Sequence, residues 1–141
     1  RDCLLSRGLG DVYKRQIIGG YAQGKLNYVL QRYTDESCLV YDAEFPEKEE
    51  NRNGEKIIIN HLHQWIKRQV EMGGNPEDEI EKYVEKHRDI VIISDEIGNG
   101  IVPVDVLERE YRERTGRILV RLASGADEVV RVICGIGQKI K

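Results

Sequence analysis

Short apolar runs alternate along the chain with stretches whose apolar residues recur at helical spacing. The strand-like runs are residues 17–18, 37–42, 57–59, 90–94 and 129–134. The helix-like stretches are residues 26–33, residues 62–72, an acidic stretch that Asn75 opens, and a long stretch that Asp105 can cap. Because strands and helices alternate with short connections, the pattern predicts an α/β fold whose open, mostly parallel sheet has helices on both faces.

A glycine-rich loop, GGYAQGK, joins the first strand to the first helix. It matches the P-loop pattern, in which backbone N–H groups and a helix N-terminus bind phosphate and a lysine reaches the terminal phosphates. The candidate nucleotide-binding residues are Gly19, Gly20, Tyr21, Ala22, Gln23, Gly24, Lys25 and Leu26. A chance glycine turn is the alternative, but the strand before the loop and the helix after it favour phosphate binding.

Leu26 stands where the P-loop pattern has Ser or Thr. Its side chain has no oxygen for Mg²⁺, so a metal ion must be held elsewhere or assists nucleotide binding less. The sequence therefore supports nucleotide binding better than turnover. It also predicts a triphosphate affinity that changes little when Mg²⁺ is removed.

Composition limits the class of partner. The chain has 141 residues, which suits one domain, and its 22 basic and 25 acidic residues give a net charge of −3. This balance offers no broad cationic surface for nucleic acid, and no apolar stretch approaches the roughly 20 residues that span a membrane. Three scattered cysteines predict reduced thiols, with Cys38 and Cys134 in the core. We expect a cytoplasmic protein.

The first residues, RDCLLSRGLGDVYKRQ, show neither clear periodicity nor the continuous apolar region of a signal peptide. We interpret residues 1–16 as a non-native N-terminal segment that does not pack on the protein. Residues 17–141 are then a single P-loop nucleotide-binding domain.

Further candidate residues follow the buried strands, where ligands bind in open α/β sheets. Glu96, together with Asp95, could hold a metal ion or act as a general base, or it could hydrogen-bond the glycine turn that follows it. His61 and His63 could serve as base, ligand or covalent acceptor, or they could cap a helix and face solvent. His87 lies in an acidic stretch and is expected to be a surface residue.

Several motifs along the chain are those of one known family. They are IIGGYAQGK at 17–25, INHLHQWI at 59–66, EIGNGIVP at 96–103, YRERTG at 111–116 and ADEV at 126–129. With them the chain resembles the bifunctional adenosylcobinamide kinase and adenosylcobinamide-phosphate guanylyltransferase family over nearly all of residues 17–141.

The resemblance implies a P-loop NTPase-like (RecA-like) transferase of cobalamin biosynthesis. Such an enzyme uses ATP or GTP to phosphorylate adenosylcobinamide, a corrinoid, and then attaches GMP through a guanylylated histidine. In this chain Lys25, Glu96 and His61 become the candidate catalytic residues, and Arg112 the candidate arginine for phosphate. The resemblance also implies that subunits associate as a homo-oligomer.

The chain departs from the family pattern at several positions. Leu26 replaces the metal-binding hydroxyl, Asn60 replaces an aspartate, and Asp95 and Leu119 each replace an asparagine. The family's guanylylation helix would fall at 43–56, where this chain has no histidine. The kinase role is therefore favoured over guanylyl transfer, and Mg²⁺ is an ion that could accompany the nucleotide. The alternative is a catalytically impaired nucleotide-binding protein with a regulatory or vestigial role.

Overall fold

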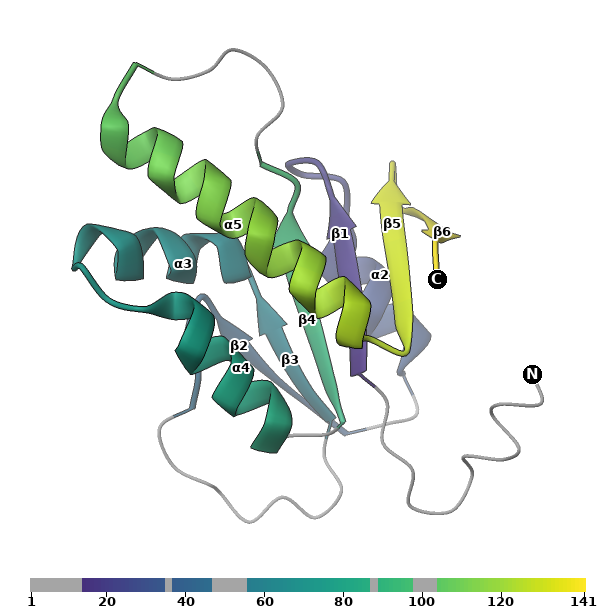
Figure 1. Ribbon diagram of the computed structural model, residues 1–141. Helices are drawn as coiled ribbons and strands as arrows, with labels where there is room; N and C mark the ends of the chain where they lie inside the picture. Colours follow the sequence, from purple (N-terminus) through teal and green to yellow (C-terminus); the bar gives the residue numbers. More distant parts are fainter. Residues whose placement is uncertain (1–13, 35–36, 47–55, 87–88, 98–103) are drawn as a thin grey trace.

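Six strands form one sheet in the order β2-β3-β4-β1-β5-β6 (Figure 1). The computed structural model describes residues 14–34, 37–46, 56–86, 89–97 and 104–141. The strands are β1 (Lys14–Gly19), β2 (Cys38–Asp42), β3 (Lys56–Asn60), β4 (Ile90–Asp95), β5 (Glu128–Ile133) and β6 (Ile136–Lys139). Strands β1 to β5 are parallel, whereas β6 pairs with β5 in the antiparallel sense. The predicted α/β class with a mostly parallel sheet is confirmed.

Helices cover both faces of this sheet, as the sequence predicted (Figure 1). One face carries α2 (Lys25–Arg32), and the other carries α3 (Leu62–Glu71), α4 (Pro76–Lys86) and α5 (Val106–Gly125). Within β3, Ile57 and Ile59 join the core beneath α3, α4 and α5, whereas Ile58 joins the core beneath α2. The continuous β-branched runs therefore reflect burial on both faces. None of these four helices is long and apolar enough to cross a membrane.

Two predicted helix starts are confirmed. Asp105 is the N-cap of α5, and its carboxylate accepts a hydrogen bond from the Leu107 N–H at 2.9 Å. The side-chain oxygen of Asn75 accepts one from the Asp78 N–H at 3.4 Å, directly before Pro76 opens α4. Both arrangements satisfy N–H groups that have no partner within the first turn of a helix.

Strand β1 begins at Lys14, ahead of the boundary that the sequence suggested. The Lys14 N–H donates to the Asp127 carboxylate at 2.9 Å. Gln16 is only 2% exposed, and its amide Nε2 donates to the Leu119 carbonyl of α5 at 3.2 Å. The expectation that the chain up to Gln16 does not pack on the protein is therefore wrong for Lys14–Gln16. That residues 1–16 are non-native stays a prediction, and residues 1–13 lie outside the described part.

The hairpin between β5 and β6 was not predicted. Cys134 and Gly135 form its two-residue turn, with φ angles of 50° and 76°. Positive φ at both central residues is the geometry that matches the twist of paired antiparallel strands. Cys134 is consequently exposed, not in the core as expected, whereas Cys38 packs partly buried beneath α2.

Candidate phosphate-binding site

The glycine loop lies at the carboxyl end of β1, in the middle of the sheet. A side chain at Gly19 would place its Cβ 2.5 Å from the Val132 carbonyl oxygen of β5, so only glycine fits there. Gly24 has a φ of 82°, a left-handed conformation that glycine adopts without strain, and α2 begins at the next residue. The predicted order of strand, glycine loop and helix is confirmed.

Lys25 opens α2 and folds back over the loop. Its side chain is 6% exposed, and its Nζ donates to the Gly20 carbonyl oxygen at 2.6 Å. The same Nζ lies 2.6 Å from Oδ1 of Asp95, the last residue of β4. The lysine of the loop is therefore buried in an ion pair with the neighbouring strand end.

His63 holds the other side of Asp95. Its Nδ1 accepts a hydrogen bond from the Asp95 backbone N–H at 3.2 Å, and its Nε2 lies 3.3 Å from Asp95 Oδ2. An Nδ1 that accepts requires the neutral tautomer with its proton on Nε2, which then donates to the carboxylate. Burial lowers the pKa of His63 and outweighs the opposing effect of Asp95, while His61 and Lys25 lower it further. Neutral His63 thus orients Asp95 toward Lys25.

A second histidine lies at the end of β3. His61 is the N-cap of α3 with a φ of 54°, and its Nδ1 lies 2.5 Å from Oδ1 of Asp42, the last residue of β2. The Asn60 amide also donates to this carboxylate oxygen, at 3.3 Å. With Nδ1 held by Asp42, the His61 Nε2 remains available as a base or nucleophile. The His61 and His63 rings are edge to face, with centroids 5.7 Å apart.

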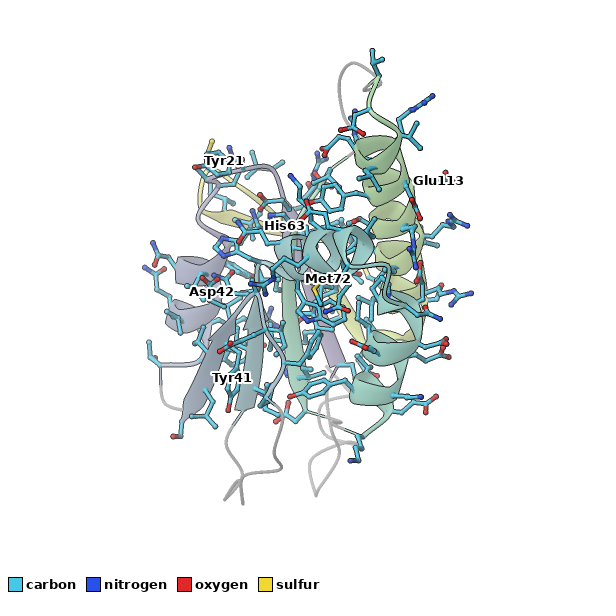
Figure 2. The ribbon with its side chains drawn as sticks, turned by 90° about the vertical axis from the view of Figure 1, so that its left-hand side faces the viewer. Tyr21, Tyr41, Asp42, His63, Met72 and Glu113 are labelled. Carbon is cyan, nitrogen blue, oxygen red and sulfur yellow. The ribbon has the colours of Figure 1, made fainter. Side chains whose placement is uncertain are left out.

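These contacts follow from the parallel sheet, which brings the carboxyl ends of its strands to one edge. Figure 2 shows Asp42 and His63 on the same side of Tyr41 as Tyr21 of the glycine loop. A series of polar groups therefore runs from the end of β2, past β3 and β4, to the lysine that follows β1.

All the predicted site residues except Arg112 lie at this edge of the sheet. Lys25, His61 and the glycine loop share this edge with Glu96, whose N–H donates to the Gly19 carbonyl at 2.7 Å. The Glu96 carboxylate, however, pairs with Arg131 of β5 at 3.0 Å, so Asp95 and not Glu96 contacts Lys25. Arg112 lies on α5, and its predicted contact with phosphate stays a prediction.

Other predicted features lie partly or wholly outside the described residues. His87 and the glycine turn at 98–103 are among them, as is the segment 47–55 of the loop without histidine.

Within the glycine loop, Tyr21 is 85% exposed, and Ala22 has a φ of 55°. Both side chains are exposed, so a ligand can reach them.

The positions where P-loop enzymes hold Mg²⁺ do not fit that ion here. Leu26 packs against the core beneath α2 and carries no oxygen. The Asn60 side chain interacts with Asp42 and His61. Among the described residues no three His, Cys, Asp or Glu side chains form a group that could hold a metal ion. These side chains alone make no resident metal site.

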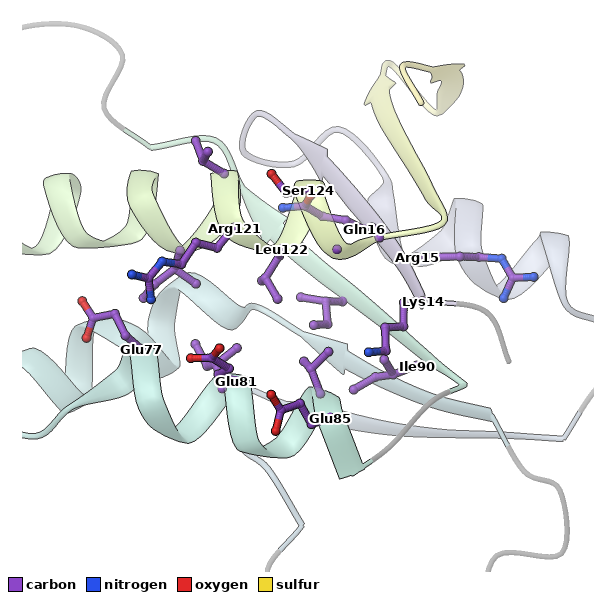
Figure 3. Close-up of a pocket in the computed structure, with 17 residues that line it drawn as sticks. Lys14, Arg15, Gln16, Glu77, Glu81, Glu85, Ile90, Arg121, Leu122 and Ser124 are labelled. Atoms are coloured by element: carbon purple, nitrogen blue, oxygen red, sulfur yellow. The ribbon is translucent and has the colours of Figure 1, made fainter. Parts of the chain in front are cut away.

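A cavity of about 490 Å³ lies elsewhere, between α4, α5 and the sheet (Figure 3). Its lining includes Gln16 and Ile90 near the amino ends of β1 and β4, and Ser124 at the end of α5. It is therefore at the opposite end of the strands from the glycine loop. The candidate phosphate-binding edge does not include this cavity.

The comparisons with known proteins agree with this architecture. A family model described as cobinamide kinase / cobinamide phosphate guanyltransferase matches residues 42–140. The chain belongs to this family. The resemblance stated from the sequence is thereby confirmed, although the match begins after the glycine loop.

Two curated relatives share a shorter segment with the chain. Both are described as bifunctional adenosylcobalamin biosynthesis protein CobU, one from Salmonella typhimurium strain LT2 and one from Escherichia coli strain K12. They are 50% and 46% identical to this chain over 52 residues. The matched segment is 37% of this chain and 29% of each relative.

Sequence reasoning missed Asp42 and the contact between Asp95 and Lys25. Asp42 ends a strand-like run, and that position at the carboxyl end of a parallel strand was a usable signal. The sequence could not predict whether Asp95 or Glu96 contacts Lys25, because this depends on which of the two adjacent side chains points toward β1.

Proposed function

We propose that the chain is a kinase of the cobinamide kinase type. It binds a nucleoside triphosphate, ATP or GTP, at the glycine loop and transfers the terminal phosphoryl group to a hydroxyl group of a corrinoid. Membership of the cobinamide kinase / cobinamide phosphate guanyltransferase family supports this acceptor. A cytoplasmic location and association into a homo-oligomer remain predictions from the sequence and the family likeness.

The single observation that carries the proposal is the position of Lys25. A buried ammonium group lies over a glycine loop, at the N-terminus of a helix, at the carboxyl end of the central strand. In a P-loop, backbone N–H groups, the helix dipole and one lysine stabilise the phosphate charge together, and this position of Lys25 supports the same arrangement here.

The chemistry needs a proton acceptor besides Lys25. The acceptor hydroxyl oxygen attacks the terminal phosphorus, the bond to the leaving nucleoside diphosphate breaks, and the hydroxyl proton must go to a base. We assign that base to His61, because Asp42 holds its Nδ1 and leaves Nε2 to accept the proton. Glu96 is the less suitable base, because Arg131 holds its carboxylate.

Guanylyl transfer is not part of the proposal. The segment 43–56, where the family likeness would place the guanylylated histidine, has none.

A second candidate function is nucleotide binding without transfer, in a regulatory or vestigial protein. One observation favours it: Leu26, partly buried against the core beneath α2, stands at the position where a hydroxyl group would assist the metal ion. Nucleotide binding and phosphoryl transfer must therefore be measured separately.

The test is phosphoryl transfer from ATP or GTP, labelled at the terminal phosphate, to adenosylcobinamide. We expect labelled corrinoid with the unmodified chain and almost none with Lys25→Ala. Lys82→Ala, which removes an exposed lysine of α4, is the matched control and should retain the activity. Nucleotide binding without labelled corrinoid would favour the second function. Unchanged binding in Lys25→Ala would contradict the phosphate site itself.

A further inference from the structure

The ion pair of Lys25 places an anion where a phosphate is expected to bind. The ammonium group has three N–H donors, of which one reaches Gly20 and one reaches Asp95, each at 2.6 Å. The side chains of Lys25 and Asp95 are only 6% and 13% exposed. A terminal phosphate that approaches Lys25 therefore meets a carboxylate that little water screens.

Asp95 is also prevented from turning away. His63 accepts from its backbone N–H and lies against its second carboxylate oxygen, so both ends of the residue are held. His63 itself is 7% exposed in the first turn of α3. Moving the carboxylate away from an incoming phosphate would break this pair of contacts in a buried place.

We propose that Asp95, positioned by His63, selects the ionic form of the nucleotide, so that the site binds a triphosphate complexed with a divalent cation and discriminates against the free triphosphate. The inference rests on the proposed function of the glycine loop as a triphosphate site. It assigns to Asp95 a role in specificity and to His63 a positioning role.

The reason is charge. Two anionic groups a few ångströms apart in a poorly solvated place disfavour each other, whereas a cation carried on the phosphates offsets the second negative charge. Lys25 alone cannot neutralise both a carboxylate and a triphosphate. Repulsion from Asp95 thus makes the binding free energy of the free triphosphate less favourable than that of the cation-bound triphosphate.

This inference reverses an expectation from the sequence. Leu26 has no side-chain oxygen, and Asn60 has an amide where the family has a carboxylate; these two differences predicted that removing Mg²⁺ would change the affinity little. The carboxylate on Lys25 predicts a strong dependence instead. Its cause is repulsion of the free triphosphate and not a set of protein ligands for the ion.

The test is calorimetric titration of the full chain with ATP and with GTP, in excess Mg²⁺ and in excess chelator. We expect binding to be at least about tenfold tighter with Mg²⁺, the size of effect that one neighbouring charge gives. Asp95→Asn should tighten binding in chelator by a similar factor and bring the two affinities close together. Asp78→Asn makes the same chemical change on an exposed residue of α4 and should keep the difference of the unmodified chain.

His63 is tested by two variants that separate positioning from packing. His63→Leu removes both contacts to Asp95 and should reduce the difference between Mg²⁺ and chelator. His63→Gln retains an acceptor and a donor and should restore it. If both variants lower the melting temperature but keep the difference of the unmodified chain, His63 is structural only and its positioning role is wrong.

The outcomes separate this inference from the proposed function. Equal affinity with and without Mg²⁺ in the unmodified chain, or an Asp95→Asn variant that keeps the full difference, overturns the inference and leaves the triphosphate site intact. Absence of triphosphate binding in the unmodified chain under both conditions overturns the proposed function and this inference together.

Discussion

The carbonyl oxygen of Gln23 accepts a hydrogen bond from the Gly135 N–H at 2.8 Å. The side-chain oxygen of Gln23 accepts a second one, from the Cys134 N–H at 2.7 Å. The glycine loop is thereby fastened to the turn between β5 and β6, on the side opposite the contact between Lys25 and Asp95. The hairpin therefore supports the shape of the glycine loop at which we propose that phosphate binds.

Gln23→Ala is expected to weaken triphosphate binding. The substitution removes one hydrogen bond of about 1 kcal/mol, which corresponds to about a fivefold loss of affinity if the bond holds the binding conformation of the loop. Calorimetric titration with the Mg²⁺ complex of ATP or GTP measures the change. Gln31→Ala, on an exposed position of α2, is the control and should bind as the unmodified chain does. Equal affinity of the two variants would show that the hairpin does not support the loop.

The amino end of β1 should contribute to stability. Lys14–Gln16 pair with β4 and β5, and Gln16 is buried against α5. A chain that begins at Ile17 loses this part of the central strand, so its melting temperature should fall clearly below that of a chain that begins at Lys14. Thermal unfolding of the two truncated chains isolates the contribution of these three residues. Equal melting temperatures would restore the boundary suggested by the sequence.

Periodicity and cap residues predicted the fold well. The β-branched runs of β3 and β4 indicated burial on both faces, and Asn75 and Asp105 marked the helix starts that are observed. These signals are local, because one strand or one helix turn carries each of them. The hairpin turn at Cys134 and Gly135 was missed because the apolar run 129–134 was interpreted as one continuous strand, whereas β5 ends at Ile133.

The candidate site was predictable only in part. The glycine loop has a local pattern, so Lys25 was found. The partners of Lys25 and His61 come from other strand ends, and they depend on strand order and on side-chain direction. Strand order is a property of the whole sheet, so no single motif contains it. Lys14–Gln16 were excluded from the sheet for another reason: the polar sequence KRQ shows no strand periodicity and was assigned to the non-native segment.

Stability should fall in mild acid partly because of His63. Burial lowers the pKa of His63 in the folded protein, so below about pH 6.5 the unfolded chain binds a proton that the folded chain resists. The contribution of neutral His63 to the free energy of unfolding is complete above that pH. It is lost as the pH falls toward the pKa of His63 in the folded protein. His63→Gln has no such group, so its free energy of unfolding should decrease less between pH 7.5 and pH 5. Denaturant unfolding at both pH values measures this difference, and parallel losses in the two proteins would contradict it.

A substitution of Leu26 should affect both the stability of the fold and the dependence of nucleotide binding on Mg²⁺. Its side chain packs partly buried against the core beneath α2, so Leu26→Ser should lower the free energy of unfolding by about 1–3 kcal/mol. Leu30→Ser lies in the same helix at a position 38% exposed, and it should cost less.

The same substitution returns a hydroxyl group to the place that a P-loop enzyme uses for its metal ion. Combined with Asn60→Asp, Leu26→Ser should widen the difference in triphosphate affinity between Mg²⁺ and chelator beyond that of the unmodified chain. Calorimetry on the double variant, with circular dichroism to verify folding, measures this. If the double variant folds and its difference stays the same, the first turn of α2 does not face the phosphates as a P-loop helix does. Lys25 would then contact the nucleotide without a metal ion at its side, and Asp95 alone would set the dependence on Mg²⁺.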